Sequence, residues 1–262
     1  MSLLVLVKLS YFVAATLFLL GLQRMASPKT ARSGIQWAGV GMLIATAATF
    51  FLPGLHNIAL MLAAIVIGVG LNWAWGRKVA ITDMPQMVAL FNGMGGGSAA
   101  AIGAVELVRF SGGEPVPSKL ALVLAVVGAL IGAVSLTGSI IAWAKLDGRM
   151  DKRYTFPGQQ WFNALVFVAA VVCGAMAIHT LAMPWIVAFF VVALALGVLM
   201  TLPIGGADMP VVISLYNAFT GLAVAFEGYV LGNEALIIAG TMVGAAGMLL
   251  TRLMAKAMNR KI

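Results

Sequence analysis

Two asparagines, Asn92 and Asn217, are the side chains best placed for chemistry, because they hold the same position in a motif that occurs twice in apolar sequence. Each copy begins with Asp-Met-Pro, at Asp83 and at Asp208, and reaches a Leu-aromatic-Asn triplet that ends nine residues later. Glycines follow at matching positions in the two copies: Gly96 and Gly103, then Gly221 and Gly228. Fixed spacing over about twenty residues predicts a duplicated structural unit.

A carboxamide inside a membrane must be hydrogen-bonded, so each asparagine is expected to face other polar groups or water. Ser214 and Thr220 share a helical face with Asn217, and small residues flank Asn92. Two roles remain open from the residues alone. The amides either join helices by hydrogen bonds or line a path for water and protons.

The composition of the chain is that of an integral membrane protein, with 62% hydrophobic and 9% charged residues among 262. Apolar runs of about twenty residues are long enough to cross a bilayer as helices. Nine such runs predict an all-α, polytopic transmembrane helix bundle that forms a single domain over residues 1–262. Their expected cores are 3–22, 34–52, 57–75, 84–107, 119–144, 161–180, 184–203, 209–231 and 234–254.

The lysines and arginines are unevenly divided between the two ends of the predicted helices. Three lie on the side of the N-terminus, Lys8, Arg109 and Lys119, and thirteen lie on the other side. Positive residues favour the cytoplasmic side, so we expect the N-terminus outside and the C-terminus in the cytoplasm. The net charge of +8 belongs to short loops beside the lipid bilayer and does not indicate nucleic acid. The thirteen are Arg24, Lys29, Arg32, Arg77, Lys78, Lys145, Arg149, Lys152, Arg153, Arg252, Lys256, Arg260 and Lys261.

An even number of helix steps separates the two motif copies, so both are expected to run in the same direction from the cytoplasmic face. Helices two to five and six to nine would then form a parallel repeat, with the functional site between the halves. Asp83 and Asp208 are expected to cap their helices, since each is followed by a proline in the first turn. Nine residues of helical rise, about 13.5 Å, place both asparagines near the middle of the membrane.

Groups that carry protons are absent from the predicted centre of the membrane. Glu106 and Glu227 lie toward the outer ends of their helices, and the two histidines belong to outer connections. The lone Cys173 excludes an intrachain disulfide and a cysteine metal cluster, so no metal site is expected. If protons cross this bundle, the titrating group comes from another chain or lies near a helix end.

Three stretches of the sequence closely resemble one enzyme family. They run from Ile204 through Asn217 to Arg260, from Thr137 to Leu146, and from Ser27 to Arg32. On these residues the chain resembles the membrane domain, or domain II, of the β subunit of proton-translocating NAD(P)+ transhydrogenase. The resemblance covers essentially the whole chain.

The resemblance implies a chain that couples proton passage across the membrane to hydride transfer between NAD(H) and NADP(H), which bind in separate soluble domains. Its implied partners are the membrane helices and NAD(H)-binding domain of the α subunit, the NADP(H)-binding domain of the β subunit, and a second αβ unit. The implied location is the bacterial cytoplasmic (inner) membrane. The chain itself is expected to hold no catalytic or cofactor-binding residue and no hydride-transfer activity, because family members continue beyond the position of Ile262.

The family match also implies roles for particular residues. Asn217 matches an asparagine of the proton path and Asp208 an aspartate at the cytoplasmic mouth, whereas Asn92 stands where several members have a histidine. A protonatable residue of the α subunit, a histidine, is therefore expected beside Asn92, Ser139 and Asn217. The predicted proton-path residues are Asn217, Asn92, Ser214, Ser139 and Thr220. The predicted docking residues at the cytoplasmic face are Asp208, Asp83, Lys145, Arg149 and Arg153.

Two other functions fit parts of the sequence. A secondary transporter of a small solute would also use parallel repeats and central polar residues, although no interrupted helix or central charge favours it. A purely structural membrane anchor is the third possibility.

Overall fold

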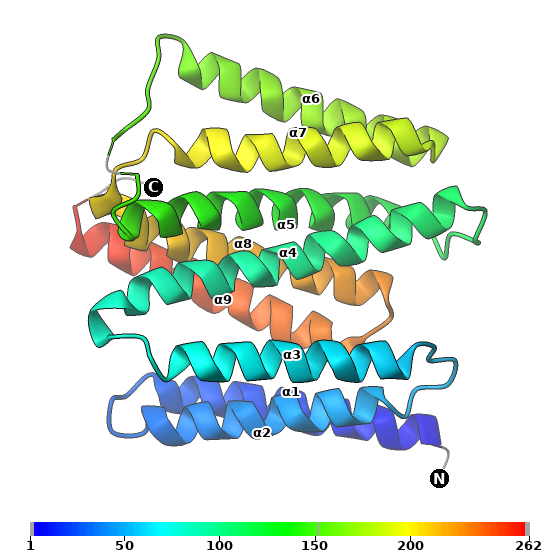
Figure 1. The fold of residues 1–262 in the computed structure, drawn as a ribbon. Coiled ribbons are helices and arrows are strands. Elements are labelled where there is room, and N and C mark those ends of the chain that lie inside the picture. Colours follow the sequence, from blue (N-terminus) through cyan, green and yellow to red (C-terminus); the bar gives the residue numbers. More distant parts are fainter. Residues whose placement is uncertain (1–2, 151, 260–262) are drawn as a thin grey trace. The chain divides into compact units, whose positions relative to one another are not determined.

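The computed structural model describes residues 3–150 and 152–259. Over these residues the chain forms nine long α-helices and no strand (Figure 1). Arg260 and Lys261, which belong to the basic count at the C-terminus, lie outside the described residues. The helices are α1 (Leu3–Met25), α2 (Ala31–Thr49), α3 (Ile58–Gly76), α4 (Met84–Ser111), α5 (Lys119–Leu146), α6 (Gln159–Thr180), α7 (Met183–Thr201), α8 (Met209–Val230) and α9 (Glu234–Ala257).

Each of the nine predicted apolar runs is confirmed as a helix, but only eight of these helices are long and apolar enough to cross a membrane within the described residues. The exception is α2, whose first two turns carry Arg32, Ser33 and Gln36. These polar residues lower its mean hydropathy below that of its neighbours. The predicted nine-helix bundle is therefore confirmed, with eight of the described helices apolar enough to span a membrane.

The chain divides into two compact units, Met1–Met84 and Pro85–Ile262. In the first unit α1 packs along α2 through small residues. A Cβ added to Gly34 would lie 2.6 Å from the carbonyl oxygen of Gly21, so the two backbones approach closely. The hydroxyls of Tyr11 and Thr49 share a hydrogen bond of 2.9 Å between these helices.

The second unit is built around α5, which packs against α7 and α8, while α6 packs on α7 and α9 on α8. Two helices of this unit begin with a side-chain cap. Ser118 accepts a hydrogen bond from the amide of Ala121 at the start of α5, and Asn233 accepts one from Leu236 at the start of α9. Small residues again line the contacts, so the helix axes lie close enough for short polar side chains to meet.

Both copies of the Asp-Met-Pro motif form the same local structure. A single 3-10 turn, η1 (Ile81–Asp83) or η2 (Gly206–Asp208), precedes the helix that begins at the following methionine. Asp208 is the N-cap residue of α8 by position, but its side chain makes no capping hydrogen bond. The predicted helix start is thus confirmed and the predicted cap interaction at Asp208 is wrong. The parallel repeat and the orientation in the membrane stay predictions.

Gly197 of α7 provides a test of this packing. A Cβ at Gly197 would lie 2.4 Å from the carbonyl oxygen of Val134 on α5, a backbone atom that cannot move without moving the helix. We expect Gly197→Ala to destabilise the chain by about 2 kcal/mol through overpacking. Thermal unfolding of the chain in detergent micelles measures the effect. Gly39→Ala is the control, because nothing lies within 4 Å of its added Cβ, and equal Tm values for the two variants would contradict the predicted packing.

Candidate functional site

A buried cluster of polar side chains joins α4, α5 and α8. Asn92 on α4 donates through Nδ2 to the hydroxyls of Ser139 and Ser135 on α5, at 2.9 and 3.3 Å. Ser135 in turn shares a hydrogen bond of 2.5 Å with the hydroxyl of Thr220 on α8. All four residues are buried. We call Asn92, Ser135, Ser139 and Thr220 the polar cluster.

Glycines of α4 make the polar cluster possible. A Cβ at Gly96 would lie 2.9 Å from both the Gly132 carbonyl oxygen and Cβ of Ser135, and one at Gly93 would lie 3.1 Å from Cβ of Ser139. The absence of side chains at these positions brings α4 against α5. The short asparagine side chain then reaches the serine hydroxyls across the helix contact.

Three of the five predicted proton-path residues therefore lie together, namely Asn92, Ser139 and Thr220. Ser214 lies on α8 but accepts a hydrogen bond of 3.0 Å from the buried hydroxyl of Thr251 on α9. Asn217 is half-buried, and its side-chain amide makes no hydrogen bond with any residue that the structure describes. The predicted residues are thus divided in three ways. Asn92, Ser139 and Thr220 belong to the polar cluster, Ser214 pairs with Thr251, and the Asn217 amide lies outside both groups.

Ser135 is a member of the polar cluster that the sequence analysis missed. Its signal was present, because Ser135 precedes Ser139 by four residues and so shares its helical face. A second missed contact is the hydrogen bond of 2.6 Å between the hydroxyls of Tyr216 and Thr201, both buried. The Tyr216 ring lies over Gly138, whose added Cβ would be 2.5 Å from its Cζ.

The predicted docking residues behave differently from one another. Lys145, near the end of α5, is buried at 6% exposure, and its Nζ donates to the carbonyl oxygens of Thr201, Leu202 and Ile204. These hydrogen bonds attach the end of α7 and the segment that follows it to α5. We call this segment, residues 202–208 between α7 and α8, the 202–208 connector. Lys145 thus binds the backbone of its own chain at this end, and its predicted docking role stays a prediction.

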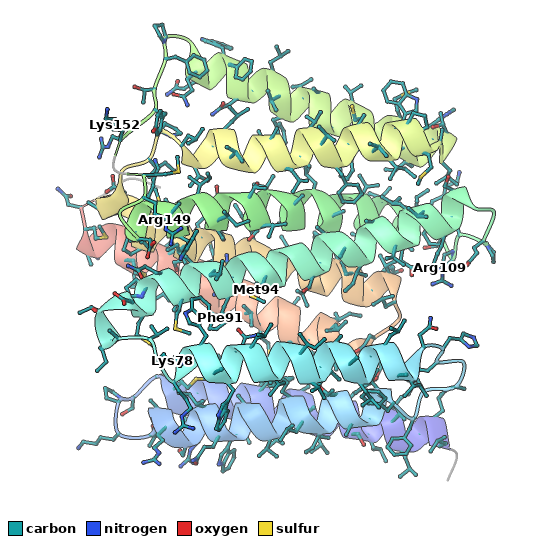
Figure 2. All side chains as sticks on the ribbon, in the orientation of Figure 1. Lys78, Phe91, Met94, Arg109, Arg149 and Lys152 are labelled. Atoms are coloured by element: carbon teal, nitrogen blue, oxygen red, sulfur yellow. The ribbon has the colours of Figure 1, made fainter. Side chains whose placement is uncertain are left out.

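The other basic residues lie at the same end of the second unit. Arg149 pairs with Asp147 at 2.5 Å, and its guanidinium lies 4.9 Å from the centre of the Trp143 ring. Nη2 of Arg153 lies 3.7 Å from Oδ2 of Asp208, and its guanidinium covers Gly205 in the connector. Figure 2 shows Arg149 and Lys152 at this end and Arg109 at the opposite end of the second unit. These contacts link the α5–α6 loop to the start of α8.

Asp83 belongs to the first unit, where it accepts a hydrogen bond of 3.2 Å from the hydroxyl of Thr82. On the other side of the motif, Gln86 on α4 donates to the carbonyl oxygen of Leu146 at 3.1 Å. A hydrogen bond therefore links the start of α4 to the end of α5. The start of α8 is linked to the same region by the contacts of Lys145 and Arg153.

The polar cluster contains amides and hydroxyls but no ionisable group. Within the described residues no three histidine, cysteine, aspartate or glutamate side chains come together to hold a metal ion. Hydroxyls both donate and accept, so they relay hydrogen bonds between an amide and water. The cluster is therefore suited to conducting protons that arrive from another group, and unsuited to storing one.

Comparison with known proteins decides the family. The family model described as NAD(P) transhydrogenase beta subunit matches residues 7–262. The chain belongs to this family. The beta subunit of Rhodospirillum rubrum is 38% identical over 258 residues, which is 97% of this chain and 56% of the relative, and a second sequence from a named strain of that organism matches equally. The chain thus spans about half the length of the curated relatives it matches.

The family assignment confirms the resemblance seen in the sequence and gives no support to the solute-transporter alternative. With eight helices suited to crossing a membrane in its described part, the chain is a multi-pass membrane protein.

Proposed function

We propose that this chain is the proton-translocating membrane domain of an NAD(P)+ transhydrogenase in the bacterial cytoplasmic membrane. It couples proton passage to hydride transfer between NAD(H) and NADP(H), which are held by the NAD(H)-binding domain of an α subunit and the NADP(H)-binding domain of a β subunit. The working assembly is a dimer of αβ units. The observation that carries the proposal is the polar cluster buried among apolar helices in a chain of this family.

The polar cluster has an open position for a partner group. Nδ2 of Asn92 donates to two serines, while Oδ1 is buried and accepts from no described residue. A buried acceptor without a donor is costly, so a donor is expected there in the assembled enzyme. A histidine on a membrane helix of the α subunit would supply it and would carry the proton that the cluster itself cannot hold.

Coupling to the nucleotide domains runs through the 202–208 connector. Its contacts with Lys145 and Arg153 tie the position of Asp208 to the end of α5. Docking of a soluble domain on this end of the second unit, where Arg149 is also expected to face it, would shift α8 and with it Thr220 of the polar cluster. Asp83 of the first unit is proposed as a further docking residue. The proposal thus assigns Asp208 a signalling role.

Charge reversal at Asp208 separates signalling from a purely structural role. Asp208→Lys places a cation beside Arg153, so we expect hydride transfer in the assembled enzyme to lose its dependence on the proton gradient, by tenfold or more. Asp208→Asn is the matched control that removes the charge without reversing it. Both variants lose the pair with Arg153, so their free energies of unfolding should lie within about 1 kcal/mol of each other. Full coupling in Asp208→Lys would exclude the signalling role.

A double variant of Asn217 and Ser214 tests the proposed proton path. We expect Asn217→Leu combined with Ser214→Ala to lower proton-coupled hydride transfer at least tenfold, because together they remove polar groups from two turns of α8. The reconstituted αβ enzyme in vesicles, with nucleotide binding measured in parallel, gives the readout. Asn72→Leu on α3 is the control, since the Asn72 amide bonds the carbonyl of Gly68 on its own helix at 2.7 Å. Unchanged coupled rates in the double variant would remove Asn217 and Ser214 from the proton path.

A further inference from the structure

Glu227, near the end of α8 opposite to Asp208, is a buried carboxyl group with no hydrogen-bond partner. Its side chain is 0% exposed. Neither Oε1 nor Oε2 forms a hydrogen bond with any residue that the structure describes. An ionised carboxylate in such a position has lost its water without gaining a partner, which strongly favours the neutral form. The burial of Glu227 therefore makes its carboxyl group a candidate for binding a proton.

The surroundings of Glu227 leave space for this group and for nothing larger. A Cβ added to Gly103 on α4 would lie 2.8 Å from Oε1 of Glu227, and one added to Gly128 on α5 would lie 2.5 Å from the same atom. Any other residue at either position would force the carboxyl group to move from its present place. The two glycines and Ala129 thus form a niche that the Glu227 carboxyl fills.

The niche lies in the same contact between α4, α5 and α8 as the polar cluster. From Thr220 to Glu227 is seven residues along α8, and from Gly96 to Gly103 is seven residues along α4. Seven residues are two helical turns, so each pair shares a face, about 10 Å apart. α5 runs in the opposite direction, so the matching position on α5 lies seven residues before Ser135, at Gly128. Glu227 therefore lies in the α4–α5–α8 contact, two turns beyond the polar cluster.

A chain of charged groups connects this niche to the end of the second unit. Glu106 on α4 lies three residues beyond Gly103, which faces Glu227, and it accepts a hydrogen bond of 2.9 Å from Arg109. Arg109 also pairs at 2.6 Å with Glu114, and the Arg109 and Glu114 side chains are 50% and 49% exposed. Figure 2 shows Arg109 at this end of α4. Exposure thus falls from Glu114 through Glu106 to Glu227.

The other described elements around Glu227 place their titratable residues farther along the helices. α5 meets Glu227 at Gly128, nine residues from Lys119 at its start. α9 packs on the adjacent Gly228 through Leu236 and Ile237, and the titratable residue at that end of α9 is Glu234, which is exposed. Glu106, paired with Arg109, is thus the acidic residue nearest along α4 to the niche.

We propose that Glu227 is a proton-binding site of the translocation path, loaded from water through the Glu106–Arg109–Glu114 cluster. This inference rests on the proposed function, because it places the site in the same path as the polar cluster. On loading, a hydronium ion at the Glu114 end loses a proton: its O–H bond breaks, an O–H bond forms at the Glu227 carboxylate, and a neutral water remains. On release, the Glu227 O–H bond breaks and a water molecule accepts the proton as hydronium.

Infrared spectroscopy of the assembled αβ enzyme tests the proton on Glu227. The carbonyl stretch of a protonated carboxyl group, which shifts when water is replaced by D2O, is expected in the wild type and is expected to disappear in Glu227→Gln. Glutamine keeps the shape of the side chain, so the niche stays filled. The exposed Glu234→Gln is the control and should keep the band. A band that is unchanged in Glu227→Gln would overturn the proposal.

Proton transport by the same variants tests the role in the path. In vesicles, Glu227→Gln is expected to lower proton-coupled hydride transfer at least tenfold, while Glu234→Gln keeps the wild-type rate. In Glu227→Gln, loss of the infrared band without loss of coupling would overturn the role of Glu227 in the path. A wild-type enzyme that shows the band but moves no protons would instead contradict the proposed function. The two failures are therefore distinguishable.

Gly128→Ala is the second variant, for use if Glu227→Gln does not assemble. Its methyl group fills the niche, so it is expected to weaken the same band. An unchanged band in Gly128→Ala would overturn the proposal.

Discussion

Thr220→Val is expected to lower proton-coupled hydride transfer by at least tenfold. Valine keeps the shape of threonine but removes the hydroxyl that shares a hydrogen bond of 2.5 Å with Ser135, so the polar cluster loses its link to α8. The buried Ser135 hydroxyl keeps Asn92 as a partner, and we expect a stability loss of about 1–2 kcal/mol. Steady-state rates of the assembled enzyme and its thermal unfolding measure the two effects.

Thr241→Val is the matched control for Thr220→Val. The Thr241 hydroxyl is exposed and bonds only carbonyls of its own helix, at Ile237 and Ile238. Its loss should change neither the coupled rate nor Tm. A Thr220→Val enzyme with the rate of the control would show that protons do not use the α5–α8 contact.

Lys145→Met is the second change with a large expected effect. It removes a buried ammonium that donates to three backbone carbonyls, so the end of α7 and the 202–208 connector lose their attachment to α5. Hydrogen bonds to charged groups contribute about 1.5–3 kcal/mol, and we expect a destabilisation of about 3 kcal/mol. We also expect hydride transfer to respond less to the proton gradient, because the connector positions Asp208.

Lys152→Met serves as the control, since Lys152 is exposed at the same end of the second unit (Figure 2). Both variants remove one positive charge from that end. If Lys152→Met destabilises and uncouples as much as Lys145→Met, the effect comes from net charge, and the attachment of the connector does not explain it. Chemical or thermal unfolding and gradient-dependent hydride transfer decide between the two.

Helix positions could be predicted from the sequence because length and apolar content decide them. The nine observed helices overlap the nine predicted runs, and both motif copies begin helices at the residue after the aspartate. The inward faces of these helices could not be predicted in the same way. Lipid and helix contacts are both apolar, so an apolar helix carries little periodic signal of which face is buried.

The site shows the same limit in particular residues. Asn92 and Ser139 were identified as path residues and lie within hydrogen-bonding distance, but Ser135 was missed although it shares their contact. Lys145 sits at a helix end, where a lysine side chain reaches either water or backbone carbonyls, and the sequence does not distinguish them. Glu227 was noticed only as a residue near a helix end, because its niche is made by glycines from two other helices.

The central claim is that protons cross this chain through the α4–α5–α8 contact and thereby drive hydride transfer. The most direct measurement uses vesicles that contain the assembled αβ enzyme and an internal pH-sensitive dye. With both nucleotides added, wild-type enzyme is expected to change the internal pH as hydride moves, and Thr220→Val is expected to leave it constant although both nucleotides still bind. The same pH change in Thr220→Val as in wild type would contradict the claim.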